Sequence, residues 1–169
     1  MCIRDSCETS WSLGSESWFL DLKKEFLWKY FKYLKKQHSS PYERERLLVE
    51  ILAIDHSDRQ ARCNLKETRG DILLQKGSAE QSLGLYYQAL RECPTSALRR
   101  RFDYVFAQVL KQFFAERRYD KVDELASKYQ SFIGKEFERH YYWATAAKAI
   151  GKPKVALENF EWLLKHWTD

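Results

Sequence analysis

Apolar residues recur three and four positions apart along most of the 169-residue chain, and short polar breaks interrupt them. This spacing gathers apolar side chains on one face of an α-helix, whereas no segment shows the alternation typical of a strand. We predict eight helices, over residues 16–37, 41–54, 58–76, 78–92, 96–116, 119–132, 136–150 and 153–167. Because the connections are short, consecutive helices should lie antiparallel.

Serines mark three of the predicted helix starts. Each is followed three positions later by Glu or Gln, as in a capping box, where the hydroxyl accepts from a free amide and the longer side chain reaches back. The three segments are Ser40-Pro41-Tyr42-Glu43, Ser57-Asp58-Arg59-Gln60 and Ser78-Ala79-Glu80-Gln81. Helix stops are predicted at Gly77, Pro94, Gly134 and Gly151-Lys152-Pro153.

The composition is that of a folded helical protein. Hydrophobic residues make up 44% and charged residues 31%, which argues against disorder. The net charge of +5 is spread over interspersed acids and bases, so it does not demand a nucleic-acid partner. No apolar stretch approaches the ~18 residues of a membrane span, and no secretory signal is visible.

The first residues bear on where the protein resides. Met1-Cys2-Ile3-Arg4-Asp5-Ser6 matches an in-frame translation of a sequencing adapter, so we interpret residues 1–15 as an artefactual or disordered lead on a fragment from shotgun (metagenomic) sequencing. A true start at residue 1 would favour a cytoplasmic protein. With the true N-terminus missing, any targeting signal is lost and the localisation stays unknown.

No residue pattern predicts an enzyme, a cofactor or a metal. The cysteines at 2, 7, 63 and 93 form no CxxC pair, so we interpret them as unpaired thiols. Histidines are dispersed, and neither a G-x-S-x-G elbow nor a phosphate-binding glycine loop occurs. Glu136, Glu138 and His140 could mimic an acid/base cluster, but acids at a helix start are explained by the helix dipole.

Basic and aromatic residues alternate in the first predicted helix. The lysines are Lys23, Lys24, Lys29, Lys32, Lys35 and Lys36, and the aromatics between them include Trp28, Tyr30, Phe31 and Tyr33. Such a helix could lie on a membrane, stack on RNA or be buried between neighbouring helices. Its wide apolar arc favours burial, so the sequence disfavours contact with a membrane or with nucleic acid.

One stretch of the chain resembles the tetratricopeptide repeat (TPR). Between Cys63 and Ser96, the family's small, turn, aromatic and closing positions hold Gly70, Gly77, Ser82, Tyr86, Ala89 and Pro94. A period of about 34 residues relates two later units, and the last one has Gly151, Ala156 and Phe160 at the corresponding sites. Small residues let two helices approach closely, and the aromatic ring fills the space beside them.

The resemblance implies a fold and a function. The fold would be an all-α, right-handed solenoid of antiparallel helix pairs over residues 16–169, with pairs near 16–54, 58–96, 97–134 and 136–169. Its concave wall would bind a peptide or helix of another protein, without a cofactor. Carried over to this chain, the wall comprises Asn64, Glu67, Asp71, Gln75, Tyr104, Lys111, Phe114, Tyr141, Thr145 and Lys148.

The predicted wall has an acidic end and an aromatic centre. Glu67 and Asp71 would attract a basic residue, and Tyr104, Phe114 and Tyr141 would hold an apolar anchor. The alternative is that these aromatics only pack the interior. Two other functions remain open: a helical accessory region of a larger enzyme or membrane-anchored assembly factor, and an RNA-binding helical repeat.

The last predicted helix is apolar on more than one side. A solenoid normally ends on a polar outer face. We therefore expect further repeats, another domain or self-association at the C-terminal end.

Overall fold

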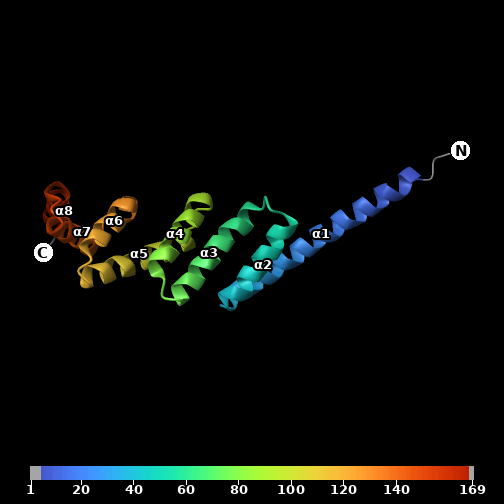
Figure 1. Ribbon diagram of the computed structural model, residues 1–169, viewed down its shortest axis with the longest axis horizontal. Coiled ribbons are helices and arrows are strands. Elements are labelled where there is room, and N and C mark those ends of the chain that lie inside the picture. Colours follow the sequence, from blue (N-terminus) through green and yellow to red (C-terminus); the bar gives the residue numbers. More distant parts are fainter. Residues whose placement is uncertain (1–4, 168–169) are drawn as a thin grey trace. The chain divides into compact units, whose positions relative to one another are not determined.

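The computed structural model describes residues 5–167 and, for side chains, residues 17–167. The protein is all-helical, with 83% of residues in helices and no strand among those described. The helices are α1 (Asp5–Lys36), α2 (Pro41–Ile54), α3 (Arg59–Gln75), α4 (Ala79–Glu92), α5 (Ser96–Ala115), α6 (Tyr119–Lys128), α7 (Phe137–Ala149) and α8 (Pro153–His166), with a 3₁₀ turn at Gln130–Phe132 (Figure 1). The predicted all-α class and the eight predicted helices are thereby confirmed.

The chain divides into two compact units. Unit 1 covers residues 1–98 and contains α1 to α4, and unit 2 covers residues 99–169 and contains most of α5 together with α6 to α8. The predicted division into four helix pairs stays a prediction. Each unit is described below by itself.

The largest difference from the predicted helix bounds is at α1. This helix begins at Asp5, so the lead expected to be artefactual or disordered over residues 1–15 is helical from Asp5 onward. No proline interrupts the stretch between Asp5 and Trp18, so the helix can continue through it. Residues 1–4 lie outside the described part of the chain.

For two helices the predicted N-cap residue is correct, but its side chain does not make the expected capping hydrogen bond. Ser40 and Ser78 stand at the N-caps of α2 and α4, yet neither hydroxyl makes a capping hydrogen bond. For α3 the cap is Asp58 and not Ser57, and its Oδ1 accepts from the Ala61 amide at 2.9 Å. A carboxylate is the stronger acceptor for the positive end of a helix, which explains the shift by one residue.

Helix ends agree with the predicted glycine stops. Gly77, Gly134 and Gly151 have φ values of 76°, 66° and 75°. This left-handed conformation reverses the chain after a helix and is costly for residues that carry a Cβ. The glycines therefore fix the short turns after α3, after the 3₁₀ turn and after α7.

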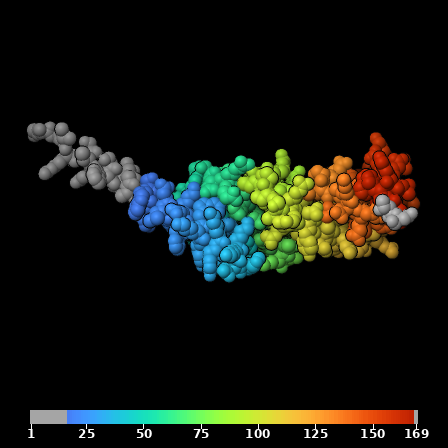
Figure 2. Space-filling view, turned by 180° about the vertical axis from the view of Figure 1, so that it is seen from behind, coloured from blue at the N-terminus to red at the C-terminus, as the bar shows by residue number. Residues whose placement is uncertain are grey.

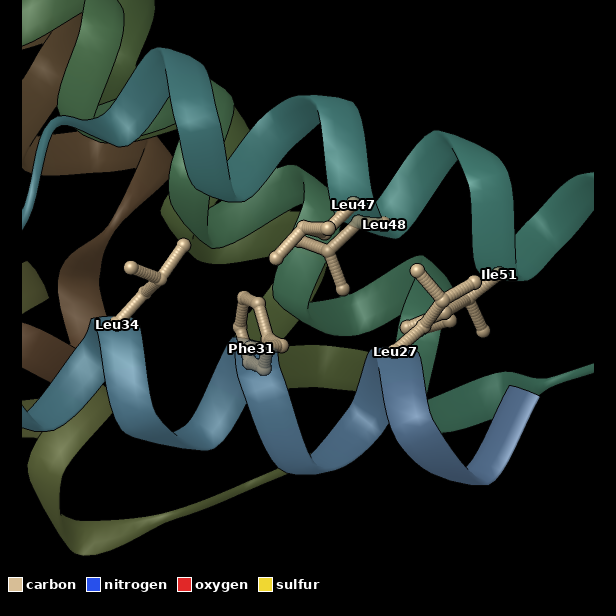
Figure 3. Packing of buried hydrophobic residues seen from close by; sticks show 7 residues of the cluster. Leu27, Phe31, Leu34, Leu47, Leu48 and Ile51 are labelled. Atoms are coloured by element: carbon tan, nitrogen blue, oxygen red, sulfur yellow. The ribbon is translucent and has the colours of Figure 1, made fainter. Parts of the chain in front are cut away.

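The core of unit 1 begins between α1 and α2. Leu27, Phe31 and Leu34 of α1 face Leu47, Leu48 and Ile51 of α2, and all six side chains are buried (Figure 3). On each helix these residues recur within three or four positions and share one face, as the apolar periodicity predicts. This packing holds α1 and α2 as an antiparallel pair.

The α3–α4 pair packs through small residues at the expected positions. Ser82 and Ala89 are fully buried, and the ring of the buried Tyr86 lies against Gly70. A Cβ at Gly70 would stand 2.6 Å from Tyr86 Cε1, closer than real side chains approach. Only glycine fits at this position without moving the ring.

Replacing Gly70 by leucine should destabilise unit 1 by about 1–3 kcal/mol, because the new side chain must displace Tyr86 from a packed core. The loss is measurable as a lower midpoint of urea unfolding. Gly84→Leu is the matched control, since a Cβ at Gly84 meets no atom within 4 Å. Equal midpoints for the two variants would show that the contact at Gly70 does not limit stability.

A disulfide joins Cys63 and Cys93, so the interpretation of all four cysteines as unpaired thiols is wrong for this pair. Cys63 lies near the start of α3 and Cys93 directly follows α4. Because the two helices are antiparallel, these positions meet, with a Cα–Cα distance of 6.1 Å. Spacing along the sequence could not reveal this, since 30 residues separate the two cysteines.

The core of unit 2 is aromatic at its centre. Phe102 and Phe106 of α5 are fully buried and contact Tyr129, with ring centroids 5.2 and 6.0 Å away. Ala144 of α7 and Ala156 of α8 are buried as well, as expected for small repeat positions. Phe160, predicted at the aromatic position, is half-buried.

Candidate protein-binding face

In unit 1, the predicted binding wall lies on α3. Asn64 and Asp71 are buried, Glu67 is half-buried, and Gln75 is exposed. Three of these four predicted positions are therefore largely covered by neighbouring parts of the unit. Their polar groups are paired within the fold, as the next two contacts show.

Lys35 of α1 covers one part of the predicted wall. Its Nζ donates to Glu67 Oε2 at 2.8 Å and to Asn64 Oδ1 at 3.3 Å. The Asn64 side-chain amide in turn donates to the Gln60 carbonyl at 2.8 Å. Glu67 and Asn64 thus connect α3 to α1.

Arg44 of α2 covers the other part. Its Nη2 donates to Asp71 Oδ2 at 3.1 Å, and the Tyr86 hydroxyl donates to Asp71 Oδ1 at 2.7 Å. All three residues are buried. Both carboxylates of the expected acidic end are therefore paired within unit 1. That Glu67 and Asp71 attract a basic residue of a partner stays a prediction.

A signal for the Arg44 contact is present in the sequence. Arg44 shares a helix face with Leu47, Leu48 and Ile51, which form the buried stripe of α2. A charged side chain in such a stripe needs a buried partner of opposite charge. The sequence did not show that this partner is Asp71, because the two residues lie on different helices.

Unit 2 leaves its part of the predicted wall open. Tyr104 and Lys111 of α5 are exposed, with 66% exposure for Tyr104, and Phe114 is half-buried. On α7, Tyr141 is 45% exposed, Lys148 is exposed, and Thr145 is half-buried. We name these six residues the α5–α7 face.

Aromatic rings connect the two helices of this face. The Phe114 centroid lies 5.9 Å from that of Tyr141 and 4.5 Å from that of Tyr142. Tyr119 adds a further ring 6.0 Å from Phe114. The structure therefore brings together two of the three predicted aromatics, Phe114 and Tyr141, while Tyr104 lies nearer the start of α5.

Tyr142 and Tyr119 were missed by the sequence reasoning. Tyr142 directly follows Tyr141, and Tyr119 starts α6, so neither has the spacing of the predicted wall. Partial burial, with the nearby Glu138 carboxylate as a second cause, raises the pKa of the Tyr142 hydroxyl. This group therefore stays protonated and able to donate a hydrogen bond at neutral pH.

The charge on the α5–α7 face is mainly positive. Lys111 and Lys148 have no ion-pair partner among residues 17–167. Glu138, one turn before Tyr141, is the acid on the same side of α7. The face can therefore offer two cations beside an aromatic surface.

Polar side chains of α7 pair with carboxylates of α5 and α6. Arg139 donates to both carboxylate oxygens of Asp103 on α5, at 2.7 and 3.0 Å, and to the Phe132 carbonyl at 2.6 Å. Asp123 of α6 accepts from Trp143 Nε1 at 2.9 Å and from Lys152 Nζ at 2.5 Å. These contacts join α7 to α5 and to α6.

The acid/base candidates have structural partners. His140 Nδ1 lies 2.7 Å from Asn159 Oδ1, and its ring stacks on Trp162 at 3.8 Å between centroids. Neither Glu136 nor Glu138 contacts His140 through a hydrogen bond or ion pair in the described structure. Among the same residues, no group of three or more His, Cys, Asp or Glu side chains is arranged to hold a metal.

The first helix departs from the expectation of burial. Phe31 is buried and Trp28 is half-buried, but Trp18, Phe26 and Tyr33 are 66%, 67% and 58% exposed. The apolar arc of α1 is therefore wide because the helix carries two apolar faces, of which α2 and α3 cover only one.

The last helix also exposes apolar residues. Ala156 and Leu163 are buried, whereas Leu157, Leu164 and Trp167 are exposed. The Trp167 ring contacts Phe137 at 5.1 Å between centroids. The expectation of a covering partner at this end stays a prediction.

No protein-family model matches this chain, and no curated protein matches it. The chain is a protein of the all-α class with two helical units. Any assignment of function therefore depends on the residues of this chain alone.

Proposed function

We propose that this protein is a TPR-like scaffold that binds a segment of another protein on the α5–α7 face and catalyses no reaction. The observation that carries the proposal is the contact of Phe114 with Tyr141 at 5.9 Å, beside two lysines without ion-pair partners. Aromatic side chains supply much of the energy at protein interfaces. A mixed aromatic and cationic surface suits recognition better than interior packing.

The TPR-like part of the proposal is supported by the helix pairs. Gly70, Ser82, Tyr86 and Ala89 pack α3 against α4 as the family pattern requires. The Asp103–Arg139 contact between α5 and α7 supports a stacking of successive first helices. A right-handed solenoid of such pairs is the arrangement that we propose for the chain.

The partner segment should combine an apolar anchor with a carboxylate. Phe114 and Tyr141 offer the surface for the anchor, and Lys111 and Lys148 offer charge for an Asp or Glu. This differs from the basic ligand expected from the sequence, because Glu67 and Asp71 already pair with Lys35 and Arg44. Complementary charge would contribute mainly to specificity and to the association rate.

Peptide selection against the purified protein tests this function. The enriched peptides should share an aromatic or aliphatic residue near an acidic one, and Tyr141→Ala should weaken their binding by about 2 kcal/mol, roughly 30-fold. Lys148→Glu should weaken it through charge repulsion. Fluorescence polarisation with a labelled peptide measures both effects.

The matched control is Tyr42→Ala, which removes an equally exposed tyrosine, 50% against 45%, from α2 of unit 1. This variant should bind the peptide like the parent, and all three variants should keep the parent's melting temperature. Peptides that bind Tyr141→Ala and the parent equally would refute the α5–α7 face as the binding site.

A further inference from the structure

The first helix carries an apolar face that nothing in unit 1 covers. Its residues are Trp18, Phe19, Leu22, Phe26, Tyr30 and Tyr33, all of them exposed. Successive members are one, three or four positions apart, and they lie on a different side of α1 from Leu27, Phe31 and Leu34, which face α2. We name these six residues the outer face of α1.

The outer face is open along the part of α1 that extends beyond α2. Lys24 meets the turn after α2, where its Nζ lies 2.6 Å from Asp55 Oδ2 and 3.1 Å from Asp58 Oδ2. Residues 17–23 precede this contact, and all of them are exposed. The space-filling view shows this blue segment projecting from the neighbouring helices of unit 1 (Figure 2).

The lysines of α1 divide into two groups. Lys24 and Lys35 point inward, to Asp55 and Asp58 and to Asn64 and Glu67. The hydrogen bonds to Asp55 and Asp58 raise the pKa of Lys24, and the reciprocal contact lowers the pKa of Asp55 to about 2. These two lysines therefore connect α1 to the rest of unit 1.

The second group borders the outer face. Lys23 lies at one edge of it and Lys32 lies beyond the other edge, while Lys29 and Lys36 share the helix side of Trp18 and Leu22. Lys29 pairs with Glu25 at 2.7 Å, whereas the other three have no ion-pair partner among the described residues. The uncovered apolar surface is therefore edged by cations on both sides.

We propose that the outer face of α1 lies in the surface of a membrane that contains anionic lipids. Trp, Tyr and Phe favour the boundary between headgroups and acyl chains, and lysines at the edge reach lipid phosphates. None of the helices that the structure describes has the length and apolar character to cross a bilayer. The contact would accordingly be one in which α1 lies along the surface.

Charge distinguishes this occupant from two others. A second copy of α1 would bring the flanking lysines of both chains together. Near the outer face, Asp21 is the acid without a basic partner in the described structure, so each chain would offer one free carboxylate to the lysines of the other. RNA would stack on aromatic rings but would leave the aliphatic Leu22 without a role. An anionic lipid surface satisfies both the lysines and the apolar side chains. This site shares no residue with the α5–α7 face.

Vesicle co-sedimentation with the full chain tests the proposal. The protein should bind vesicles of phosphatidylcholine mixed with phosphatidylglycerol, bind pure phosphatidylcholine vesicles more weakly, and lose affinity as salt rises. The double variant Trp18→Ser, Phe26→Ser should bind at least about tenfold more weakly, since it removes two large side chains from the lipid. Lys23→Gln with Lys36→Gln should lose about tenfold on the anionic vesicles only.

The matched control replaces two exposed leucines on another helix, Leu157→Ser with Leu164→Ser on α8. This variant should bind anionic vesicles like the parent, and circular dichroism should show that every variant keeps its helix content. The proposal is overturned if the parent does not bind anionic vesicles, or if the α1 variant binds them as tightly as the parent. If the parent binds no vesicles but forms a dimer in sedimentation velocity, or a complex with single-stranded RNA, that the α1 variant abolishes, the outer face binds that partner instead.

Discussion

Replacing Asp71 by alanine should lower the free energy of unfolding of unit 1 by about 3–5 kcal/mol, because it leaves a buried cation without its partner. Arg44 and Asp71 are both buried, with 11% and 8% of their side chains exposed. The Tyr86 hydroxyl would also lose its acceptor, which lies 2.7 Å away. Urea unfolding, with hydrogen exchange at the amides of α3 and α4, measures the loss in unit 1.

A surface ion pair provides the control for Asp71. Glu45 accepts from Arg69 Nε at 2.7 Å, but half of the Arg69 side chain is exposed. Glu45→Ala should therefore cost less than about 1 kcal/mol. If Asp71→Ala costs no more than this control, the buried contact has no special role in stability.

A combined variant distinguishes loss of charge pairing from loss of packing. Arg44→Met, Asp71→Leu and Tyr86→Phe together remove every polar group of the cluster and keep much of its volume. Well-packed apolar replacements of buried ion pairs are often neutral or stabilising. The combined variant should consequently be more stable than Asp71→Ala alone.

Removing the disulfide should cost about 3–4 kcal/mol of unfolding free energy, because the bond limits the freedom of the unfolded chain over a 30-residue separation. Cys93→Ser is the cleaner variant, since Cys93 is partly exposed whereas Cys63 is buried. The urea midpoint of the parent should fall to that of the variant when a reductant is added.

The same experiment contains its own control. A reductant should not change the midpoint of Cys93→Ser, because this variant has no Cys63–Cys93 bond to break. A parent midpoint that is equal with and without reductant would contradict the prediction.

The disulfide also bears on localisation. Structural disulfides persist where thiols are oxidised and are rare in the cytosol. The bond between α3 and α4 therefore disfavours the cytoplasmic location that a true start at residue 1 would have suggested. Mass spectrometry of alkylated protein from its native source tests whether the Cys63–Cys93 bond is formed there.

The sequence by itself determined the helices and the turns between them. Apolar spacing, prolines and glycines act over a few residues, so they locate α2 at Pro41–Ile54 and the turn at Gly77 without knowledge of the fold. The close contact of Gly70 with Tyr86 was also predictable, because the α3–α4 pair is joined by a short turn. Two helices that follow each other directly along the chain can be expected to pack against each other.

Only the tertiary structure decided which charges are buried and which apolar faces are open. Arg44 meets Asp71 from 27 residues away, and Lys35 meets Glu67 from 32 residues away. These partners depend on which helices lie side by side, and helical periodicity carries no information about that. For the same reason the sequence showed that α1 is apolar over a wide arc but not that Trp18, Phe26 and Tyr33 stay exposed, since burial depends on the neighbours that the packed unit supplies.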